Sequence, residues 1–322
     1  MNDQNQKESI MKCRIAFAIA MPLIVALAAV PAASAQRFYQ IPNAPALTAA
    51  APGGVSVWGE WACQGCISNV TYQFLAGQFR QVSTPTPFAN ISVGGGSVMQ
   101  FDEVWATDFN GNIFQWDNYG LTFHQVTGSL QNVVVGEGYS PCHQYEVWGS
   151  NINHEVYRYN YCSFSWDSIP GFFGNLAVGG GEVWALNGYN QVFRFNSSTN
   201  QFDLMPGTLS QISVGAGGVW GTYTDQFGTN SVWQFDPSTQ NWQQLPGPMT
   251  GIAAGADGVF GFLDTQFPVL QATAYRLNVS TRTWTQVYSS TGGWSSVGPI
   301  NVGTGAGTWM AGNLTVFDYL SF

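Results

Sequence analysis

Polar and aromatic side chains gather in four short segments whose residue types could bind a neutral ligand. Asn, Asp and His side chains exchange hydrogen bonds with hydroxyl groups, and a nearby aromatic ring offers an apolar face on which a sugar can stack. The candidate ligand-binding residues are Asp108, Asn110, Asn112, Asn151, Asn153, His154, Asn187, Tyr189, Asn190 and Asp225. The alternative interpretation is that turns are simply polar, and Asn110-Gly111 is a common hairpin pair.

Support for catalysis or for a metal cofactor is weaker. The segment 108–112 resembles a calcium loop, but a bidentate Glu at the required distance is missing. A hydrolase or lyase would need acids that converge at one point, for which Glu137, Glu146 and Glu182 are the candidates. Because an acid precedes several of the recurring Val-Trp pairs described below, these acids are better explained as a feature of the repeat. We expect neither a cofactor nor enzyme activity.

The elements that position these residues belong to an internal repeat. A Val-Gly segment, a Val-Trp pair, an alternating aromatic-x-aromatic run and a further aromatic residue before Pro-Gly recur along the chain. The anchors at the Val-Trp position are Trp58, Trp105, Trp148, Trp184, Trp220, Phe260 and Trp309. Each unit has four short strand-like runs, a to d, at a period of about 40 residues, which is typical of a β-propeller blade.

The two chain ends predict how the ring closes. The last unit stops after run c at 316–319 and lacks run d, whereas residues 38–42 look like an isolated run d. Pairing these segments would complete the blade and cover two sheet edges. We therefore predict an all-β propeller with seven four-stranded blades, and six blades plus an irregular unit as the main alternative.

The recurring anchors predict core packing between neighbouring blades, because a Trp side chain can bury about 150–250 Å². Trp61, Trp116 and Trp294 fall outside the anchor positions and are expected to be freer to contact a ligand. Glycines in the Val-Gly runs are expected where backbones crowd around the central axis.

Four cysteines remain after the leader segment. Cys142 falls in an a–b turn and Cys162 in a c–d turn of one blade, on the same rim, so a Cys142–Cys162 disulfide is predicted. Cys63 and Cys66 could form a local disulfide at a hairpin tip. A zinc site that included His154 is disfavoured, because a strand of about 17–20 Å separates the two rims and zinc bonds span only about 2.0–2.3 Å.

The first 35 residues have the features of a signal peptide. Lys12 and Arg14 precede an apolar run that ends at Ala33-Ser34-Ala35, a small-x-small cleavage pattern. We expect cleavage after Ala35, a secreted or periplasmic product without membrane insertion, and one propeller domain over 36–322. That product keeps six arginines and no lysine against 16 acidic residues, which disfavours nucleic acid as a partner because a basic stripe is missing.

The repeat resembles a known family. The run Pro-Gly-x-Leu-x-x-Ile-Ser-Val-Gly-x-Gly-Gly-Val-Trp, at 206–220, is similar to the tectonin β-propeller repeat, as is the aromatic-x-aromatic run that follows it. The resemblance is strong over 169–284 and looser towards both ends. It implies a propeller that binds carbohydrate in shallow pockets on or between the blades, although some members are parts of larger assemblies. The family usually has about six repeats.

These observations favour an exported, non-catalytic, lectin-like propeller that binds neutral glycans or cell-surface carbohydrate. The first alternative is an extracellular protein-interaction scaffold, which would use the irregular insertions at 138–144 and 266–272. The second is a propeller hydrolase or lyase. Protein partners are compatible with the first two hypotheses, since both require the same blades.

Overall fold

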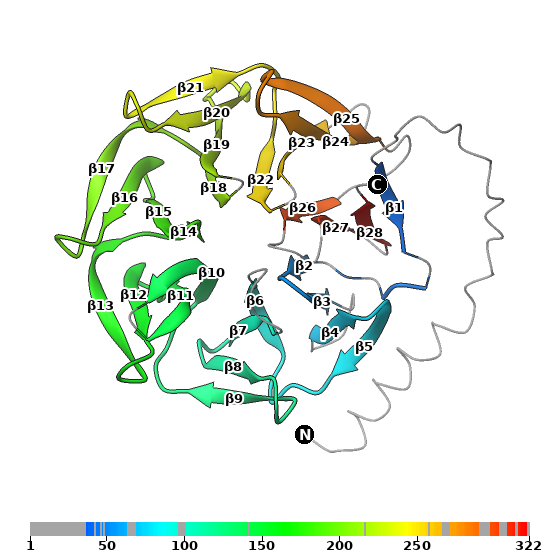
Figure 1. Ribbon diagram of the computed structural model, residues 1–322, viewed down its shortest axis with the longest axis vertical. Helices are drawn as coiled ribbons and strands as arrows, with labels where there is room; N and C mark the ends of the chain where they lie inside the picture. Colours follow the sequence, from blue (N-terminus) through cyan, green and yellow to red (C-terminus); the bar gives the residue numbers. More distant parts are fainter. Residues whose placement is uncertain are drawn as a thin grey trace.

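The computed structural model describes residues 37–320 except 42, 46, 48, 63–68, 96–100, 141, 216, 257, 266–270, 290–296, 303–307 and 313–314. Within these residues the strands form seven four-stranded antiparallel sheets. Figure 1 shows the sheets as blades around a common centre, with the first strand of each innermost and the last at the periphery. The all-β β-propeller fold is therefore confirmed. No helix long and apolar enough to cross a bilayer occurs in the described part of the chain.

Blades 1 to 4 follow one another along the chain, each with strands a to d in order. Blade 1 consists of β2 (Ala49–Pro52), β3 (Val57–Ala62), β4 (Asn69–Leu75) and β5 (Gln78–Val82). Blade 2 consists of β6 (Phe88–Gly94), β7 (Glu103–Asp108), β8 (Ile113–Asp117) and β9 (Thr122–Val126). Blade 3 consists of β10 (Asn132–Ser140), β11 (His143–Ser150), β12 (Glu155–Asn160) and β13 (Ser165–Phe172). Blade 4 consists of β14 (Asn175–Gly179), β15 (Glu182–Leu186), β16 (Gln191–Asn196) and β17 (Gln201–Thr208).

Blades 5 and 6 repeat this order, and blade 7 combines the two ends of the chain. Blade 5 consists of β18 (Gln211–Gly215), β19 (Gly218–Thr224), β20 (Asn230–Asp236) and β21 (Asn241–Leu245). Blade 6 consists of β22 (Gly251–Gly255), β23 (Gly258–Thr265), β24 (Gln271–Asn278) and β25 (Thr283–Ser289). Blade 7 consists of β26 (Val297–Val302), β27 (Thr308–Gly312), β28 (Thr315–Leu320) and β1 (Arg37–Gln40).

The ring closes through the pairing predicted from the chain ends. Strand β1 pairs antiparallel with β28, with Phe38 opposite Tyr319 and Gln40 opposite Phe317. The N-terminal strand thus serves as strand d of the last blade. The free edge of β28 is covered, so both ends of the propeller are held in one sheet.

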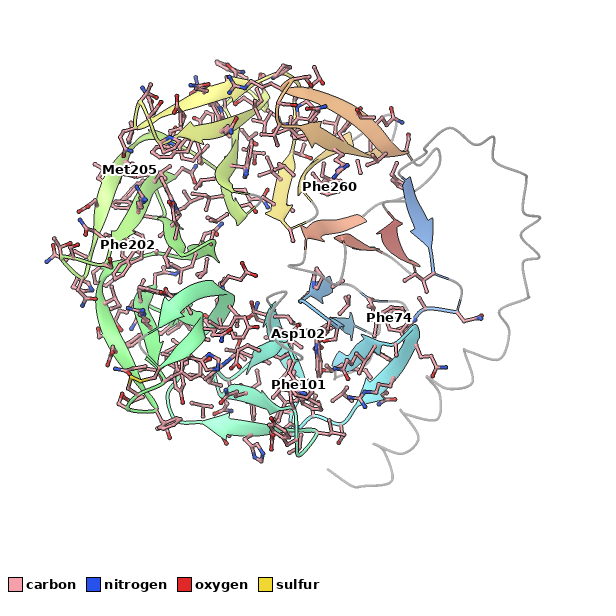
Figure 2. All side chains as sticks on the ribbon, viewed as in Figure 1. Phe74, Phe101, Asp102, Phe202, Met205 and Phe260 are labelled. Atoms are coloured by element: carbon pink, nitrogen blue, oxygen red, sulfur yellow. A yellow bond between two sulfur atoms is a disulfide. The ribbon has the colours of Figure 1, made fainter. Side chains whose placement is uncertain are left out.

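The anchor side chains form the core between blades, as predicted. Trp58, Trp105, Trp148 and Trp184 are fully buried, and side chains fill the spaces between neighbouring sheets (Figure 2). Each of these four packs against the aromatic residues of strands c and d in the next blade. Trp148, for example, meets Phe195 with ring centroids 4.7 Å apart.

The same packing corrects the expectation for Trp116. Its ring lies 4.9 Å from that of Trp58, in an edge-to-face arrangement, and the side chain is buried. Trp116 occupies the strand-c position that Phe195 holds in blade 4, so it receives the anchor of the preceding blade and cannot reach a ligand. The side chains of Trp61 and Trp294 lie outside the described residues.

Glycine permits the close approach of the inner strands. A Cβ atom added to Gly136 would lie 2.3 Å from the carbonyl oxygen of Val178 in the next blade. At Gly179 the corresponding distance to the carbonyl oxygen of Val214 is 2.7 Å. Any side chain at these positions would force neighbouring blades apart, which explains why the Val-Gly segment recurs.

Candidate functional site

The predicted ligand-binding residues lie in the b–c turns of blades 2 to 5, on one face of the ring that we call the b–c face. Each turn begins with an Asn or Asp whose side chain bonds back to the turn. Asn187 Oδ1 accepts hydrogen bonds from the backbone N–H groups of Tyr189 and Gln191, both at 3.0 Å. Asp225 Oδ1 accepts equivalent bonds from Phe227 at 2.9 Å and Thr229 at 2.8 Å. These Asx turns fix the backbone of each segment.

In blades 2 to 4 the residue at the first position also bonds to the side chain four positions later. Asp108 Oδ2 accepts a hydrogen bond from Asn112 Nδ2 at 2.7 Å, and Asn151 Nδ2 donates to Glu155 Oε2 at 2.6 Å. Although burial raises the pKa of Asp108, hydrogen bonds from Asn112 and Asn110 hold it below its ordinary value. The carboxylate is therefore an ionised acceptor committed to its own turn and to Thr86, whose hydroxyl donates to it at 3.2 Å.

The fourth residue of each turn has a left-handed backbone conformation. Gly111 and Gly228 have φ of 82° and 79°, and His154 and Asn190 occupy the same position with φ of 64° and 62°. The carbonyl oxygens of Gly111, His154 and Asn190 accept hydrogen bonds from the connection to the next blade. His154 and Asn190 are thus part of the turn backbone, in a conformation that favours Gly and Asn.

The side chains left free by this bonding share one pattern in all four described turns. Each turn exposes one apolar side chain and one amide side chain next to it in sequence. The pairs are Phe109 and Asn110, Ile152 and Asn153, Tyr189 and Asn190, and Phe227 and Gln226. Tyr189 and Phe227 are each 83% exposed, far beyond what a core or structural role requires.

The structure therefore sorts the predicted residues into two groups. Asp108, Asn112, Asn151, Asn187 and Asp225 stabilise the turns through their side chains and His154 does so through its backbone, whereas Asn110, Asn153, Tyr189 and Asn190 project from them. Phe109, Ile152 and Gln226 also project and were not among the predicted residues. Their common place, one or two positions after an Asx residue at the end of strand b, is the signal that could have identified them.

The Cys142–Cys162 disulfide is confirmed, with Cα atoms 5.4 Å apart. It joins the β10–β11 turn to the β12–β13 turn, on the face opposite the b–c face. Cys63 and Cys66 lie outside the described residues, and their pairing stays a prediction. No group of three or more His, Cys, Asp or Glu side chains that could hold a metal occurs among the described residues.

Two of the three acids considered for catalysis, Glu146 and Glu182, have side-chain partners within their own blade. Glu146 Oε2 accepts from Trp148 Nε1 at 2.8 Å, and Glu146 Oε1 accepts from Arg158 at 3.1 Å. The guanidinium of Arg158 also lies over the Trp148 ring, 5.6 Å from its centroid. Glu182 bonds in the same way to Trp184 and Arg194 in blade 4. These acids are features of the repeat that orient the anchor Trp.

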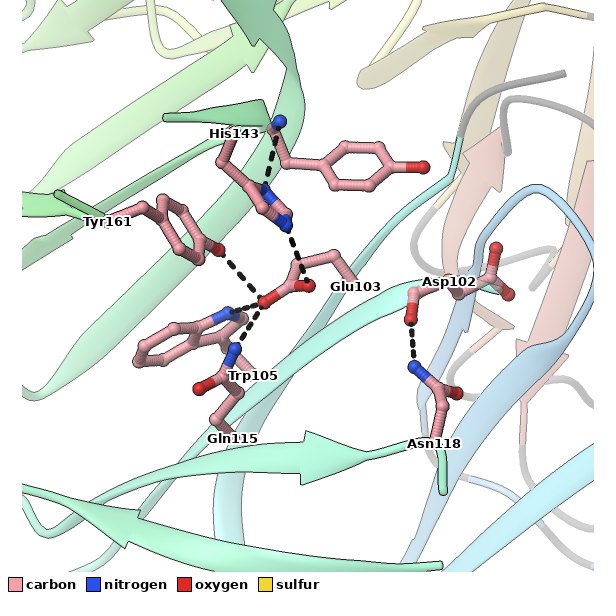
Figure 3. A network of polar contacts seen from close by, with 8 residues as sticks. Asp102, Glu103, Trp105, Gln115, Asn118, His143 and Tyr161 are labelled. Atoms are coloured by element: carbon pink, nitrogen blue, oxygen red, sulfur yellow. Dashed lines mark hydrogen bonds and ion pairs between the residues drawn. The ribbon is translucent and has the colours of Figure 1, made fainter. Parts of the chain in front are cut away.

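Blade 2 departs from this arrangement, as Figure 3 shows. Glu103 Oε1 accepts from Trp105 Nε1 at 2.6 Å, but Gln115 takes the place of the arginine. Tyr161 of blade 3 donates to the same oxygen at 2.9 Å, and the His143 ring stacks on Tyr161 with centroids 3.9 Å apart. Burial and the nearby Glu103 carboxylate raise the pKa of Tyr161, so its hydroxyl remains a donor that connects blades 2 and 3.

Comparison with known families identifies the repeat. The Tectonin domain model matches residues 87–298, a span that contains all strands of blades 2 to 6. The chain belongs to the Tectonin family. No curated protein sequence matches this tectonin-family chain.

Solved structures share the fold of this tectonin-family propeller at low sequence identity. "Structure of U3-55K" has 11% identity and a TM-score of 0.61, covering 89% of this chain and 99% of the other. "YCF48 from Cyanidioschyzon merolae" has 11% identity and a TM-score of 0.61, covering 88% and 98%. "YCF48 bound to D1 peptide" has 12% identity and a TM-score of 0.56, covering 90% and 97%. At such identities the likeness concerns the fold alone.

Proposed function

We propose that this protein binds neutral glycans on its b–c face without catalysis. The observation that carries the proposal is the pairing of one exposed apolar side chain with one exposed amide in every described b–c turn. The apolar side chain can pack against the C–H face of a sugar ring, and the amide can both donate to and accept from its hydroxyls. The hydrogen bonds that the Asx side chains make within each turn hold the pair in place before the ligand binds.

The charge distribution of these turns favours a neutral ligand. The carboxylates of Asp108 and Asp225 accept backbone N–H groups of their own turns. Glu155 is bonded to Asn151. The groups that project are amides and apolar side chains, which match uncharged hydroxyl-bearing surfaces better than anionic ones.

Repetition compensates for the weakness of each site. An exposed side chain pair in a shallow turn buries little area, so a single sugar is expected to bind weakly. A polymer or a cell surface that presents many copies of the same sugar can engage several turns at once, and the effective concentration of the second sugar then raises the overall affinity.

The proposal places this activity outside the cytoplasm. We propose cleavage after Ala35 to give one propeller domain over 36–322, in a secreted or periplasmic location. The Cys142–Cys162 disulfide supports an oxidising compartment. The partners of Glu146 and Glu182 support a binding function, since both carboxylates are engaged with Trp and Arg side chains.

A glycan-array screen of the chain from Gln36, produced in an oxidising compartment, tests this proposal. We expect binding to a related set of neutral sugars, and loss of that binding in the double variant Tyr189→Ser, Phe227→Ser. The matched control is Tyr119→Ser, which removes an equally exposed ring from the opposite face and should leave glycan binding unchanged. A blank array from folded protein, or equal losses in the two variants, would refute the assignment to the b–c face.

A further inference from the structure

The c–d turns on the other face of the ring, which we call the c–d face, also follow one design. In blades 2 to 6 each begins with Asn or Asp and has a left-handed residue four positions later. The pairs in blades 2 to 6 are Asp117 and Leu121, Asn160 and Phe164, Asn196 and Asn200, Asp236 and Gln240, and Asn278 and Arg282. In blades 4 to 6 the residues between them include Ser-Thr and the left-handed residue is polar. These five turns provide an internal comparison for one another.

Blades 2 and 3 depart from this polar design. Tyr119 is 88% exposed, Leu121 56% and Phe164 76%. Leu121 and Phe164 occupy left-handed positions with φ of 51° and 53°, where Asn200 of blade 4 has φ of 55°. A branched or aromatic residue is strained there, whereas Asn is tolerated. Because Gln240 and Arg282 share this conformation in blades 5 and 6, what distinguishes Leu121 and Phe164 is their exposed apolar surface, and exposed apolar surface of this kind points to a contact.

The turns that carry these apolar side chains contact one short segment of blade 2, residues 101–103. Phe101 is itself exposed, and its ring lies 5.7 Å from that of Tyr119. The turn that holds Tyr119 is fixed by Asn118 Nδ2, which donates to the carbonyl oxygen of Asp102 at 3.0 Å (Figure 3). Asp102 in turn accepts hydrogen bonds from the backbone of Gly54 and neighbouring residues in blade 1.

The turn that carries Phe164 is held from two sides. Tyr161 bonds to Glu103 across the blade boundary, and the Cys142–Cys162 disulfide fixes the turn to the β10–β11 hairpin. Phe164 is therefore presented on a rigid backbone. Rigid presentation of an aromatic side chain lowers the entropy cost of binding.

We propose that Phe101, Tyr119, Leu121 and Phe164, the apolar sector, form a docking surface for a protein segment that combines apolar and basic side chains. Protein interfaces commonly have aromatic residues at their centre and charged residues around them. Asp117 and Asp167 flank the sector, whereas Arg158 is paired with Glu146. Asp117 lies 3.5 Å from His124 and Asp167 accepts a hydrogen bond from Asn160, so the charged groups that flank the sector are mainly acidic, in a chain of net charge −9. A second copy of the chain, at net charge −9, would be repelled.

Selection from a random-peptide library, using the full chain from Gln36 as the target, tests this inference. We expect enrichment of peptides with aromatic or aliphatic residues next to Arg or Lys. A selected peptide, labelled with fluorescein, should bind with an affinity that falls as salt rises. Failure to enrich any peptide, or enrichment of acidic ones, would overturn the proposal.

The variant Tyr119→Ser, Leu121→Asn, Phe164→Asn restores the residue types of blade 4 and should weaken that peptide about tenfold or more. Because two of the substitutions relieve strained backbone, the variant should be at least as stable as the parent chain, so unfolding cannot cause the loss. The control Tyr189→Ser, on the b–c face, should bind normally. Equal binding of the peptide by the triple variant and the parent chain would overturn the assignment of the site. If the parent chain forms a dimer and the triple variant does not, the proposed partner is wrong and the occupant is a second copy of the chain.

Discussion

Glu60 makes the stability of blade 1 depend on pH. Its side chain is buried in β3, where Thr71 Oγ1 donates to its Oε1 at 2.8 Å. Burial raises the pKa of Glu60 to about 7, and the hydrogen bond from Thr71 only partly opposes this effect. The folded protein therefore holds a proton on Glu60 at pH values where the unfolded chain has lost it.

The sign and size of the effect follow from this difference. In the unfolded chain the carboxyl titrates near 4.5, so the folded state binds more protons than the unfolded state between pH 4.5 and about 7. Stability from this group is fully present below pH 4.5 and is lost as pH rises through about 7. At about 1.36 kcal/mol for each pH unit, the loss reaches about 3 kcal/mol.

The substitution Glu60→Gln keeps an acceptor for Thr71 and removes the titration. We expect Glu60→Gln to match the parent chain in urea unfolding near pH 4 and to exceed it by about 3 kcal/mol near pH 8. Asp203→Asn, which changes an exposed carboxyl, serves as the control and should show no comparable pH trend. The reasoning is refuted if Glu60→Gln is less stable than the parent chain near pH 8, or if the difference is the same at both ends of the range.

Two further predictions concern the repeat and the disulfide. Glu146→Ala should lower the free energy of unfolding by about 2–3 kcal/mol, because it leaves a half-buried Arg and an indole N–H without their acceptor. Glu182→Ala removes a more exposed copy of the same contact and should lower it less. Urea unfolding of both variants measures the difference. Cys142→Ser with Cys162→Ser should cost about 3 kcal/mol for the closed loop, and an equal stability of this variant and the oxidised parent chain would contradict that estimate.

The fold could be predicted because the residues that pack between blades recur in each repeat of the sequence. The anchors Trp58, Trp105, Trp148 and Trp184 pack against the aromatic residues of the next blade, so the residue type and its spacing recur. The Cys142–Cys162 pair could be predicted for the same reason, since the repeat assigns each turn to a face. Trp116 was misjudged because it is a Trp at a position where other blades have Tyr, Phe or Leu, and the difference in residue type obscured the equivalence.

The candidate site was predicted at the level of turns but not of side chains. Asn and Asp residues look equally suited to capping a turn and to binding a hydroxyl, and only the backbone conformation decides which they do. Asn187 accepts two N–H groups of its own turn, whereas Asn110 projects from its turn. Exposed apolar residues such as Ile152 were overlooked because a search for hydrogen-bonding groups does not find them.

The two faces of the ring can differ because packing fixes the backbone of each turn but leaves some of the side chains in that turn free to vary. The Asx residues and the left-handed positions fix the turn backbone on both faces, so the remaining positions can vary without loss of the fold. On the b–c face, those positions combine apolar and amide groups in four successive blades. On the c–d face they are mostly polar in blades 4 to 6, where Val279 is an exposed exception, and include large apolar side chains in blades 2 and 3. Since the turn backbone is alike within each face, we propose that the difference reflects what each face contacts: a repeated ligand suits the first pattern and a single partner suits the second.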